Sequence, residues 1–229
     1  MKPLVLIVLS SVMVLSPAGI PSARIDILRN EAETQFPDRI TFHLSASSSA
    51  SIESVQLEFG TDAAACGEST ARVVPDDFVP GVSVTTGWTW DLRRTGPLPP
   101  GTEVWWRWVV RDAAGEERTT PDQAIVVEDT QHAWRTTAAD EVNLNWYTGD
   151  SRFAGTLLEA AEDGLATLRE ATGVDYDGEL RLYVYADPAD MQAATLFAPD
   201  WSGGLAFPEH GAVLASIAVF AALAGTATA

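Results

Sequence analysis

The stretch "EVWWRWVVRD" (Glu103–Asp112) carries the clearest structural signal in this sequence of 229 residues. Apolar and charged side chains alternate along it, so that Val104, Trp106 and Trp108 share one face. An alternation of period two predicts a β-strand with one face in a core and the other toward solvent. Trp106 and Trp108 are therefore predicted to be core residues. Trp105, on the polar face, is the one tryptophan here that is left open to a binding role, such as contact with a glycan.

Segments on both sides of this strand alternate in the same way and are separated by turn signals. The predicted strands are "RITFHLSA" (Arg39–Ala46), "IESVQLEFG" (Ile52–Gly60), "VSVTTGWTWDL" (Val82–Leu92) and "QAIVVED" (Gln123–Asp129), with a hairpin at Asp112–Glu117. Many short strands with turns between them are typical of a β-sandwich. We therefore predict a β-sandwich domain over residues 24–129.

The corner that precedes the strand Glu103–Asp112 adds a resemblance to known domains. The segment "LPPGTEVWWRWVVRDAAGEE" (Leu98–Glu117) resembles the fibronectin type III and immunoglobulin-like sandwiches, in which a Leu-x-Pro-x-Thr corner precedes a strand. Val104 stands where those domains usually carry a tyrosine, so the usual corner hydrogen bond has no donor here. The resemblance implies an Ig/FnIII-like architecture and no particular function.

Beyond Trp134 the periodicity changes to an alternation of strands and helices. The predicted elements are a strand with "NLNWY" (Asn143–Tyr147), a helix from Asp150 or Ser151 to Thr172 ended by Gly173, a strand "ELRLYVYA" (Glu179–Ala186), a helix "DPADMQAATLF" (Asp187–Phe197), and a strand–turn–strand unit "GGLAFPEHGAVLAS" (Gly203–Ser216). This order is that of an α/β (α+β) domain with too few elements to complete one. We predict an incomplete α/β domain over residues 134–216.

The first 23 residues predict an export signal. Lys2 provides the positive start, Leu4–Leu15 an apolar core, and "SPA" (Ser16–Ala18) a cleavage site, with a second candidate site ending at Ala23. We therefore expect an extracytoplasmic protein, secreted or held at the cell envelope. An uncleaved anchor is the alternative, although twelve apolar residues fall short of the ~20 that a membrane span needs.

Charge and cysteine content exclude several classes of function. The formal net charge is −18, from 32 acidic and 14 basic residues. A surface of this charge repels phosphate backbones, so no nucleic-acid partner is expected. Cys66 is the only cysteine, which excludes an internal disulfide and a cysteine-based zinc site. Nothing in the sequence indicates an oligomeric state.

A search for catalytic motifs finds none. The only histidines are His43, His132 and His210, which lie in three different segments, and a His-Glu-x-x-His zinc motif is absent. Glu209 and His210 are adjacent, so on an extended chain they point to opposite sides, and a solvated turn is their expected role. No Gly-x-Ser-x-Gly elbow and no phosphate-binding glycine loop occurs. We assign no catalytic residue and no metal ligand in this chain.

Four segments together resemble the N-terminal portion of the bacterial peptidase MA-like metallohydrolases, which are gluzincin zinc peptidases. They are Asp91–Asp112, Asn143–Asp150, "LRLYVYADPADM" (Leu180–Met191) and "FAPDWSGGLAFPEHGAVL" (Phe197–Leu214), of which the last is the most specific. The resemblance implies an exported sandwich followed by a peptidase domain. It also implies that full-length relatives bind zinc through a His-Glu-x-x-His helix after "GG-x-AFPE" and hydrolyse peptide or protein substrates.

The resemblance has a positive and a negative consequence for this chain. None of the zinc ligands or the general base has a counterpart in it, so we expect the chain to be inactive by itself and to bind no cofactor. In gluzincins an edge strand ahead of the zinc helix can pair with the substrate backbone. By that analogy Gly204, Ala206 and Phe207 are predicted to lie on the substrate side.

The last residues are open to more than one interpretation. Gly211–Ala229 carries no charge, and small residues dominate it. We interpret residues 217–229 as a truncated or frame-shifted end that replaces the zinc helix. Two alternatives stand beside an inactive peptidase-like fragment: a protein tethered to a membrane by this tail, and a non-enzymatic binding or adhesion module at the cell envelope.

Overall fold

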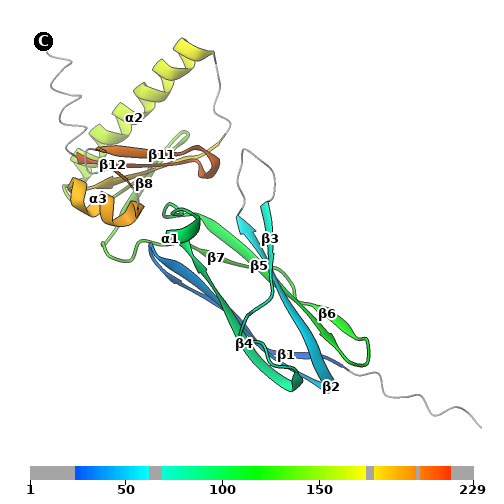
Figure 1. Cartoon of the computed structure of the whole chain (residues 1–229). Coiled ribbons are helices and arrows are strands. Elements are labelled where there is room, and N and C mark those ends of the chain that lie inside the picture. The colour runs from blue at the N-terminus through cyan, green and yellow to red at the C-terminus, as the bar shows by residue number, and fades with distance from the viewer. Residues whose placement is uncertain (1–23, 62–68, 174–177, 197, 200–201, 218–229) are drawn as a thin grey trace, which may run out of the picture.

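The computed structural model describes residues 24–61, 69–173, 178–196, 198–199 and 202–217. The described chain forms two β-sheets in succession, of seven and five strands. Figure 1 shows the first as an elongated, curled sheet and the second as a smaller sheet with helices packed on it. The predicted export signal, Cys66 and residues 218–229 of the predicted tail lie outside the described residues.

The first sheet curls because one long strand serves both of its layers. Its elements are β1 (Asp26–Gln35), β2 (Arg39–Thr61), β3 (Ser69–Val73), β4 (Gly81–Asp91), helix α1 (Leu92–Thr95), β5 (Glu103–Asp112), β6 (Glu117–Thr119) and β7 (Gln123–Val126). The first half of β2 pairs with β1 and β4, and its second half pairs with β3 and β5. Strand β5 also pairs with β6 and β7. The result is a sandwich-like fold, as the alternation predicted.

The long β2 differs from the two separate strands that the sequence predicted. The register against β4 shifts between Ser47 and Ile52, and the register against β5 shifts between Ile52 and Ser54. The chain therefore passes between layers through an irregular but extended segment. Residues 47–51 are four serines and one alanine, without glycine, proline, asparagine or aspartate. Serine occurs in turns but does not impose one, so the backbone can stay extended here.

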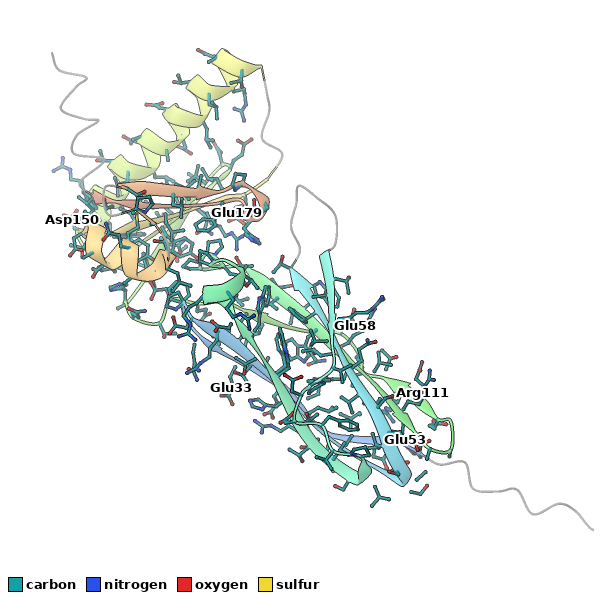
Figure 2. All side chains as sticks on the ribbon, viewed as in Figure 1. Glu33, Glu53, Glu58, Arg111, Asp150 and Glu179 are labelled. Atoms are coloured by element: carbon teal, nitrogen blue, oxygen red, sulfur yellow. The ribbon has the colours of Figure 1, made fainter. Side chains whose placement is uncertain are left out.

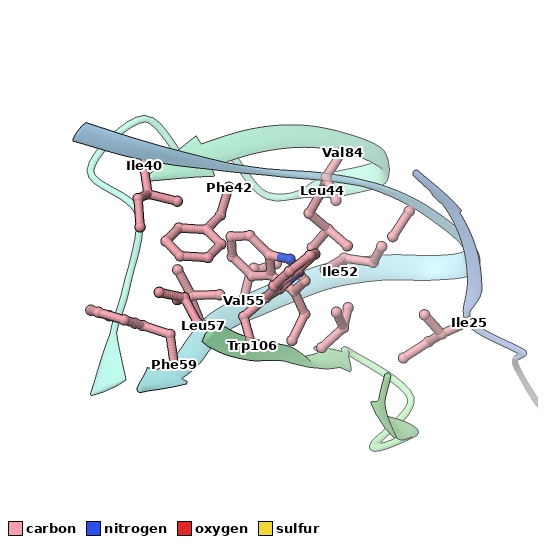
Figure 3. Close-up of a cluster of buried hydrophobic side chains, with 14 of the residues drawn as sticks. Ile25, Ile40, Phe42, Leu44, Ile52, Val55, Leu57, Phe59, Val84 and Trp106 are labelled. Carbon is pink, nitrogen blue, oxygen red and sulfur yellow. The ribbon is translucent and has the colours of Figure 1, made fainter. Parts of the chain in front are cut away.

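The inner faces of the curled sheet enclose one core, shown in Figure 3. Trp106 is 4% exposed and Trp108 is fully buried, which confirms them as core residues. The Trp106 indole nitrogen donates to Asn30 Oδ1 over 2.8 Å. Trp105 is only partly buried on the opposite face, where the Arg107 guanidinium lies 5.7 Å from the centre of its ring.

A buried carboxylate is neutralised on the outer face of β2. Glu58, labelled in Figure 2, is 6% exposed and accepts hydrogen bonds from Arg72 Nε at 2.6 Å and Arg107 Nε at 2.7 Å. These two donors, Arg72 first, hold the pKa of Glu58 below its usual value against the opposing effect of burial. The pair of guanidinium groups thus ties β3 and β5 to the strand between them.

The second sheet is mixed, with parallel strands at its centre. Its elements are β8 (Arg135–Ala139), β9 (Val142–Trp146), α2 (Ser151–Thr172), β10 (Leu180–Tyr185), α3 (Pro188–Thr195), β11 (Gly204–Phe207), the 3-10 turn η1 (Pro208–His210) and β12 (Ala212–Ser216). The strand order is β11-β12-β10-β9-β8, in which β10 runs parallel to both neighbours and the outer strands β8 and β11 are antiparallel. The predicted order of strands and helices is confirmed.

Each face of this sheet has its own core and its own helix. Leu182 and Val184 of β10 face α2, whose Leu157 packs against them in one cluster. Tyr183 and Tyr185 point to the other face, where α3 packs. Both helices begin at the predicted caps, where Asp150 and Asp187 accept hydrogen bonds from first-turn amides. Gly173 ends α2 as predicted, with a left-handed φ of 67°, whereas α3 already ends at Thr195.

The two sheets are joined at the loop before β5. The Arg181 guanidinium of β10 donates to the carbonyl oxygens of Gly101 and His210. Gly101 has a φ of +82°, and a Cβ there would lie 2.7 Å from an Arg181 nitrogen, so only glycine fits. The Tyr185 hydroxyl donates to Asp129 Oδ2 over 3.0 Å. His210 is thus half-buried and bonded, rather than in the solvated turn expected, and burial lowers its pKa.

We predict that Glu58→Gln lowers the free energy of unfolding by about 1–2 kcal/mol at pH 7, because the neutral amide accepts weaker hydrogen bonds from the two arginines. The folded pKa is depressed, so the carboxylate stabilises the fold fully above the unfolded pKa of about 4.3. That contribution is lost as pH falls through the lower folded pKa. Urea unfolding at pH 7 and at stepwise lower pH measures it.

The exposed Glu53, also on β2 and labelled in Figure 2, provides the control. Glu53→Gln removes the same charge without a described hydrogen-bond partner, and it is expected to change stability by less than about 0.5 kcal/mol. Equal effects of the two variants, or a Glu58→Gln effect that persists unchanged into acid, would contradict the assignment.

Candidate functional site: the free edge of strand β11

Strand β11 forms one edge of the second sheet. It arises from the segment "GLAF", which turns back through η1 and Gly211, whose φ of 57° is left-handed, into β12. β11 pairs antiparallel with β12 from Gly204 opposite Ala215 to Phe207 opposite Ala212. In the part of the chain that the structure describes, no other strand pairs with β11.

The register decides which residues of β11 direct their backbone groups outward. The Ser216 amide donates to the Gly203 carbonyl over 2.9 Å, just beyond the end of the ladder. In an antiparallel pair, hydrogen-bonded and non-hydrogen-bonded positions alternate. Leu205 and Phe207 are therefore bonded to β12, whereas Gly204 and Ala206 present their N–H and C=O groups to the open side.

The three predicted substrate-side residues divide along the same lines. Gly204 and Ala206 are exposed, and their backbones face away from β12. Phe207 is 9% exposed, and its side chain packs into the core on the α3 face. The buried Ser202 donates its hydroxyl to the Gly204 carbonyl over 2.9 Å. The free backbone groups of this edge are therefore the Gly204 amide and both polar groups of Ala206.

A cluster of aromatic side chains supports the sheet behind this edge. The His132 ring stacks on Tyr147 with 4.1 Å between the ring centres, and Trp134 meets Tyr147, Tyr183 and Tyr185 edge-on. The Tyr147 hydroxyl donates to Asp190 of α3 over 2.5 Å. Burial first, and then the neighbouring aspartates, raises the pKa of Tyr147 and of Tyr185, so both phenols stay protonated as donors.

Sequence reasoning did not find this cluster. A cavity of about 380 Å³ lies beside it, lined by His132, Trp134 and Tyr183 and by loop residues that flank the first sheet, among them Gly101 and Asp129. The only sequence signal was the tyrosine pair on one face of the β10 alternation. Because its partners lie up to 53 positions away along the chain, from His132 to Tyr185, spacing alone did not indicate the contact.

The histidines do not converge on one point of the fold. His43 lies in β2, His132 in the aromatic cluster and His210 in η1. Among the described residues, no group of three or more His, Cys, Asp or Glu side chains is placed to hold a metal ion. No helix of the described chain is long and apolar enough to span a membrane.

Comparison with known proteins finds one family model that matches part of the chain. A family model described as the Peptidase MA superfamily matches residues 160–228. This range includes the larger part of α2 and all of β10, α3, β11, η1 and β12. This match supports the predicted peptidase MA-like relationship for the second part of the chain. A search of curated proteins found no match.

One of the solved structures that match the chain shows how remote the likeness is. The X-ray structure of Northeast Structural Genomics Consortium target SoR45 aligns over 48% of this chain and 89% of its own, with 8% identity and a TM-score of 0.30. A likeness of this size contributes nothing to the assignment.

We predict that amide hydrogen exchange alternates along β11. The Leu205 and Phe207 amides are expected to be protected because they donate to β12, and the Gly204 and Ala206 amides to exchange at least about tenfold faster because they face the open edge. Exchange of individual amides followed by NMR measures the pattern. Strong protection of the Ala206 amide would show that another segment covers this edge.

A pair of proline variants checks the same register through stability. Ala206→Pro removes an outward N–H, which edge strands tolerate, so the fold is expected to persist. Leu205→Pro removes a hydrogen bond to β12 and leaves its acceptor unpaired, so it is expected to lower the free energy of unfolding by about 1–3 kcal/mol. The opposite order of the two stabilities would overturn the assignment of Ala206 to the free edge.

Proposed function

We propose that residues 134–216 are the substrate-strand part of a peptidase MA-like zinc metallopeptidase domain. The observation that carries the proposal is the antiparallel edge strand β11, which lies inside the family match and directs the Gly204 and Ala206 backbones outward. An extended peptide pairs with such an edge through its main chain. In full-length relatives this strand would hold a peptide or protein substrate.

The residues on the open side suit a role that does not depend on substrate sequence. Gly204 has no side chain and Ala206 only a methyl group, so neither hinders the approach of another backbone. A Cβ at Gly204 would lie 3.4 Å from the Leu214 carbonyl on the β12 side, at ordinary contact distance. Phe207 contributes through its buried side chain, which fixes the end of the strand to the α3-side core.

We further propose that this chain does not hydrolyse peptides by itself. Zinc in the related peptidases would activate a water molecule for attack on the peptide carbonyl. His43 lies in β2, His132 between β7 and β8, and His210 in η1, and the sequence contains no His-Glu-x-x-His helix to hold the metal and the base. Without a metal site, the open edge of β11 can still bind and orient an extended peptide.

For the first part of the chain we propose an Ig/FnIII-like sandwich. Its support is the strand pairing: β1, the first half of β2 and β4 make one layer, and β3, the second half of β2, β5, β6 and β7 make the other. Val104 is fully buried in the core at the position where the resembling domains usually carry a tyrosine. An apolar contact would therefore stand in place of their corner hydrogen bond.

A second candidate function is a non-enzymatic binding module at the cell envelope. One observation favours it: a cavity of about 740 Å³ on the first sheet is lined by the partly exposed Trp88 and Trp90. Trp105, the tryptophan that the sequence left open to such a role, is less suited because Arg107 already lies over its ring.

Binding at the β11 edge is tested directly with an extended peptide. Titration of ¹⁵N-labelled protein with the blocked peptide acetyl-TVTVT-amide is expected to shift the Gly204 and Ala206 amides and to leave those of β8, the opposite edge, unchanged. Ala206→Pro is expected to abolish the shifts, whereas Glu53→Gln leaves them intact. Shifts confined to β8, or none at any peptide concentration, would refute a substrate strand.

Inactivity is tested separately from binding. After dialysis against zinc, the protein is expected to retain far less than one equivalent and to leave casein intact over many hours. Metal analysis of the protein and gel analysis of the casein measure the two outcomes. One bound equivalent of zinc together with cleavage would contradict the proposed inactivity while leaving the substrate strand in place.

We propose that the chain is exported through residues 1–23. The mature protein is then expected to begin at Gly19 or Arg24, depending on which of the two candidate sites is cleaved. Fractionation of cells that express the whole chain, followed by N-terminal sequencing, measures this. Leu9→Arg interrupts the apolar core and is expected to retain the protein inside the cell. An unprocessed N-terminus in the wild-type protein would favour an uncleaved anchor.

A further inference from the structure

The cavity on the first sheet has an aromatic floor. Phe59, labelled at one end of the core in Figure 3, lies 4.9 Å from Trp88 and 5.0 Å from Trp90 between ring centres. The Trp90 indole nitrogen donates to Thr95 Oγ1 over 2.8 Å, which fixes that ring. Unlike Trp106 and Trp108, the two rings of β4 remain partly exposed, and a cavity of about 740 Å³ lies over them. Its size is that of a small-ligand site.

The rim of this cavity carries uncompensated negative charge. Asp76, Asp77 and Asp91 line it, against a single base, Arg94. Asp91 is already paired, because Arg93 donates to both of its oxygens at 2.9 and 3.1 Å. Asp76 and Asp77 form no ion pair with any described residue. Two carboxylates without an ion pair therefore line the same cavity as the two indole rings.

The Asp77 carboxylate is held in place from within the sheet. Its Oδ1 accepts a hydrogen bond from the buried Thr86 hydroxyl over 2.5 Å, which leaves Oδ2 for another donor. Thr86 lies two positions before Trp88 on β4, so the same strand positions the carboxylate and the ring. Gly87 between them brings β4 close to β2, because a Cβ there would lie 2.8 Å from the Phe42 carbonyl.

We propose that this cavity binds an organic cation with an apolar stem, such as the side chain of an arginine or lysine of a basic peptide. The indole faces attract a cation through their quadrupole and cover its stem, and Asp76 and Asp77 neutralise its charge. A neutral sugar would use the rings but not the two free charges. The net charge of −18 adds a long-range attraction for basic partners. The site is independent of the β11 edge and of the peptidase relationship.

The test uses the indole N–H signals of ¹⁵N-tryptophan-labelled protein. Titration with acetyl-arginine amide, and separately with tetramethylammonium chloride, is expected to shift the Trp88 and Trp90 signals saturably, with dissociation constants on the order of millimolar for such small probes. Trp90→Phe assigns one signal and keeps an aromatic face. Methyl-β-glucoside is expected to shift neither signal, and sodium chloride serves as the ionic-strength reference.

Two double variants with the same change in net charge separate a local effect of the cavity from the effect of the protein's overall negative charge. Asp76→Asn with Asp77→Asn is expected to weaken binding of acetyl-arginine amide roughly fivefold or more. Glu53→Gln with Glu103→Gln changes the net charge equally at exposed positions outside the cavity, and it is expected to weaken binding less than twofold. All four positions are exposed, so both variants are expected to fold, which the dispersion of the NMR signals confirms.

Each possible result either supports or overturns the proposal. Saturable shifts that only the Asp76/Asp77 variant weakens support the cation site, and a response to acetyl-arginine amide alone identifies a peptide side chain as the preferred source. Absence of saturable shifts with either cation overturns the proposal. So does equal weakening by both double variants, or a glucoside response stronger than the cation response.

Discussion

Strand β10 must bury both of its faces, and this constraint organises the second half of the molecule. It runs parallel to β9 and β12, so it lies in the middle of the sheet and not at an edge. Leu182 and Val184 serve the α2 side, while Tyr183 and Tyr185 serve the α3 side. The tyrosine face also carries polar tips, one of which reaches Asp129 at the junction with the first sheet. The same strand thus builds two cores and, with Arg181, the joint between the sheets.

Position within the sheet also determines where β11 lies. Since β10 occupies the centre and β12 pairs directly beside it, only the outer side of β12 is left for β11. The 3-10 turn and Gly211 reverse the chain within a few residues, which makes the pair antiparallel. A free backbone edge then follows from topology and not from any special side chain. This explains why a candidate site can exist in a segment whose outward residues are only glycine and alanine.

Local patterns predicted much of this fold, and contacts between distant segments account for what they missed. The alternation of Glu103–Asp112 identified Trp106 and Trp108 as core, and the caps at Asp150 and Asp187 placed two helix starts. The continuity of β2 was missed because serines are compatible with both a turn and an extended strand. The His132 cluster and the Asp77–Thr86 contact were missed because each depends on residues brought together only by packing. The sequence predicted that Gly204, Ala206 and Phe207 belong to the candidate site. Which of them direct their backbone groups to the open edge depends on the register of β11 against β12.

The two candidate sites rest on different physics, and this separates their roles. Pairing at β11 uses uncharged backbone groups, so it is largely indifferent to salt and to the side chains of the partner. The cavity over Trp88 and Trp90 depends on two solvent-exposed carboxylates, whose attraction at a distance is screened within about 8 Å at physiological ionic strength. A partner that used both would need a basic residue at a fixed distance from an extended segment. A partner that used the cavity alone would need only the cation, so the two sites can serve separate ligands.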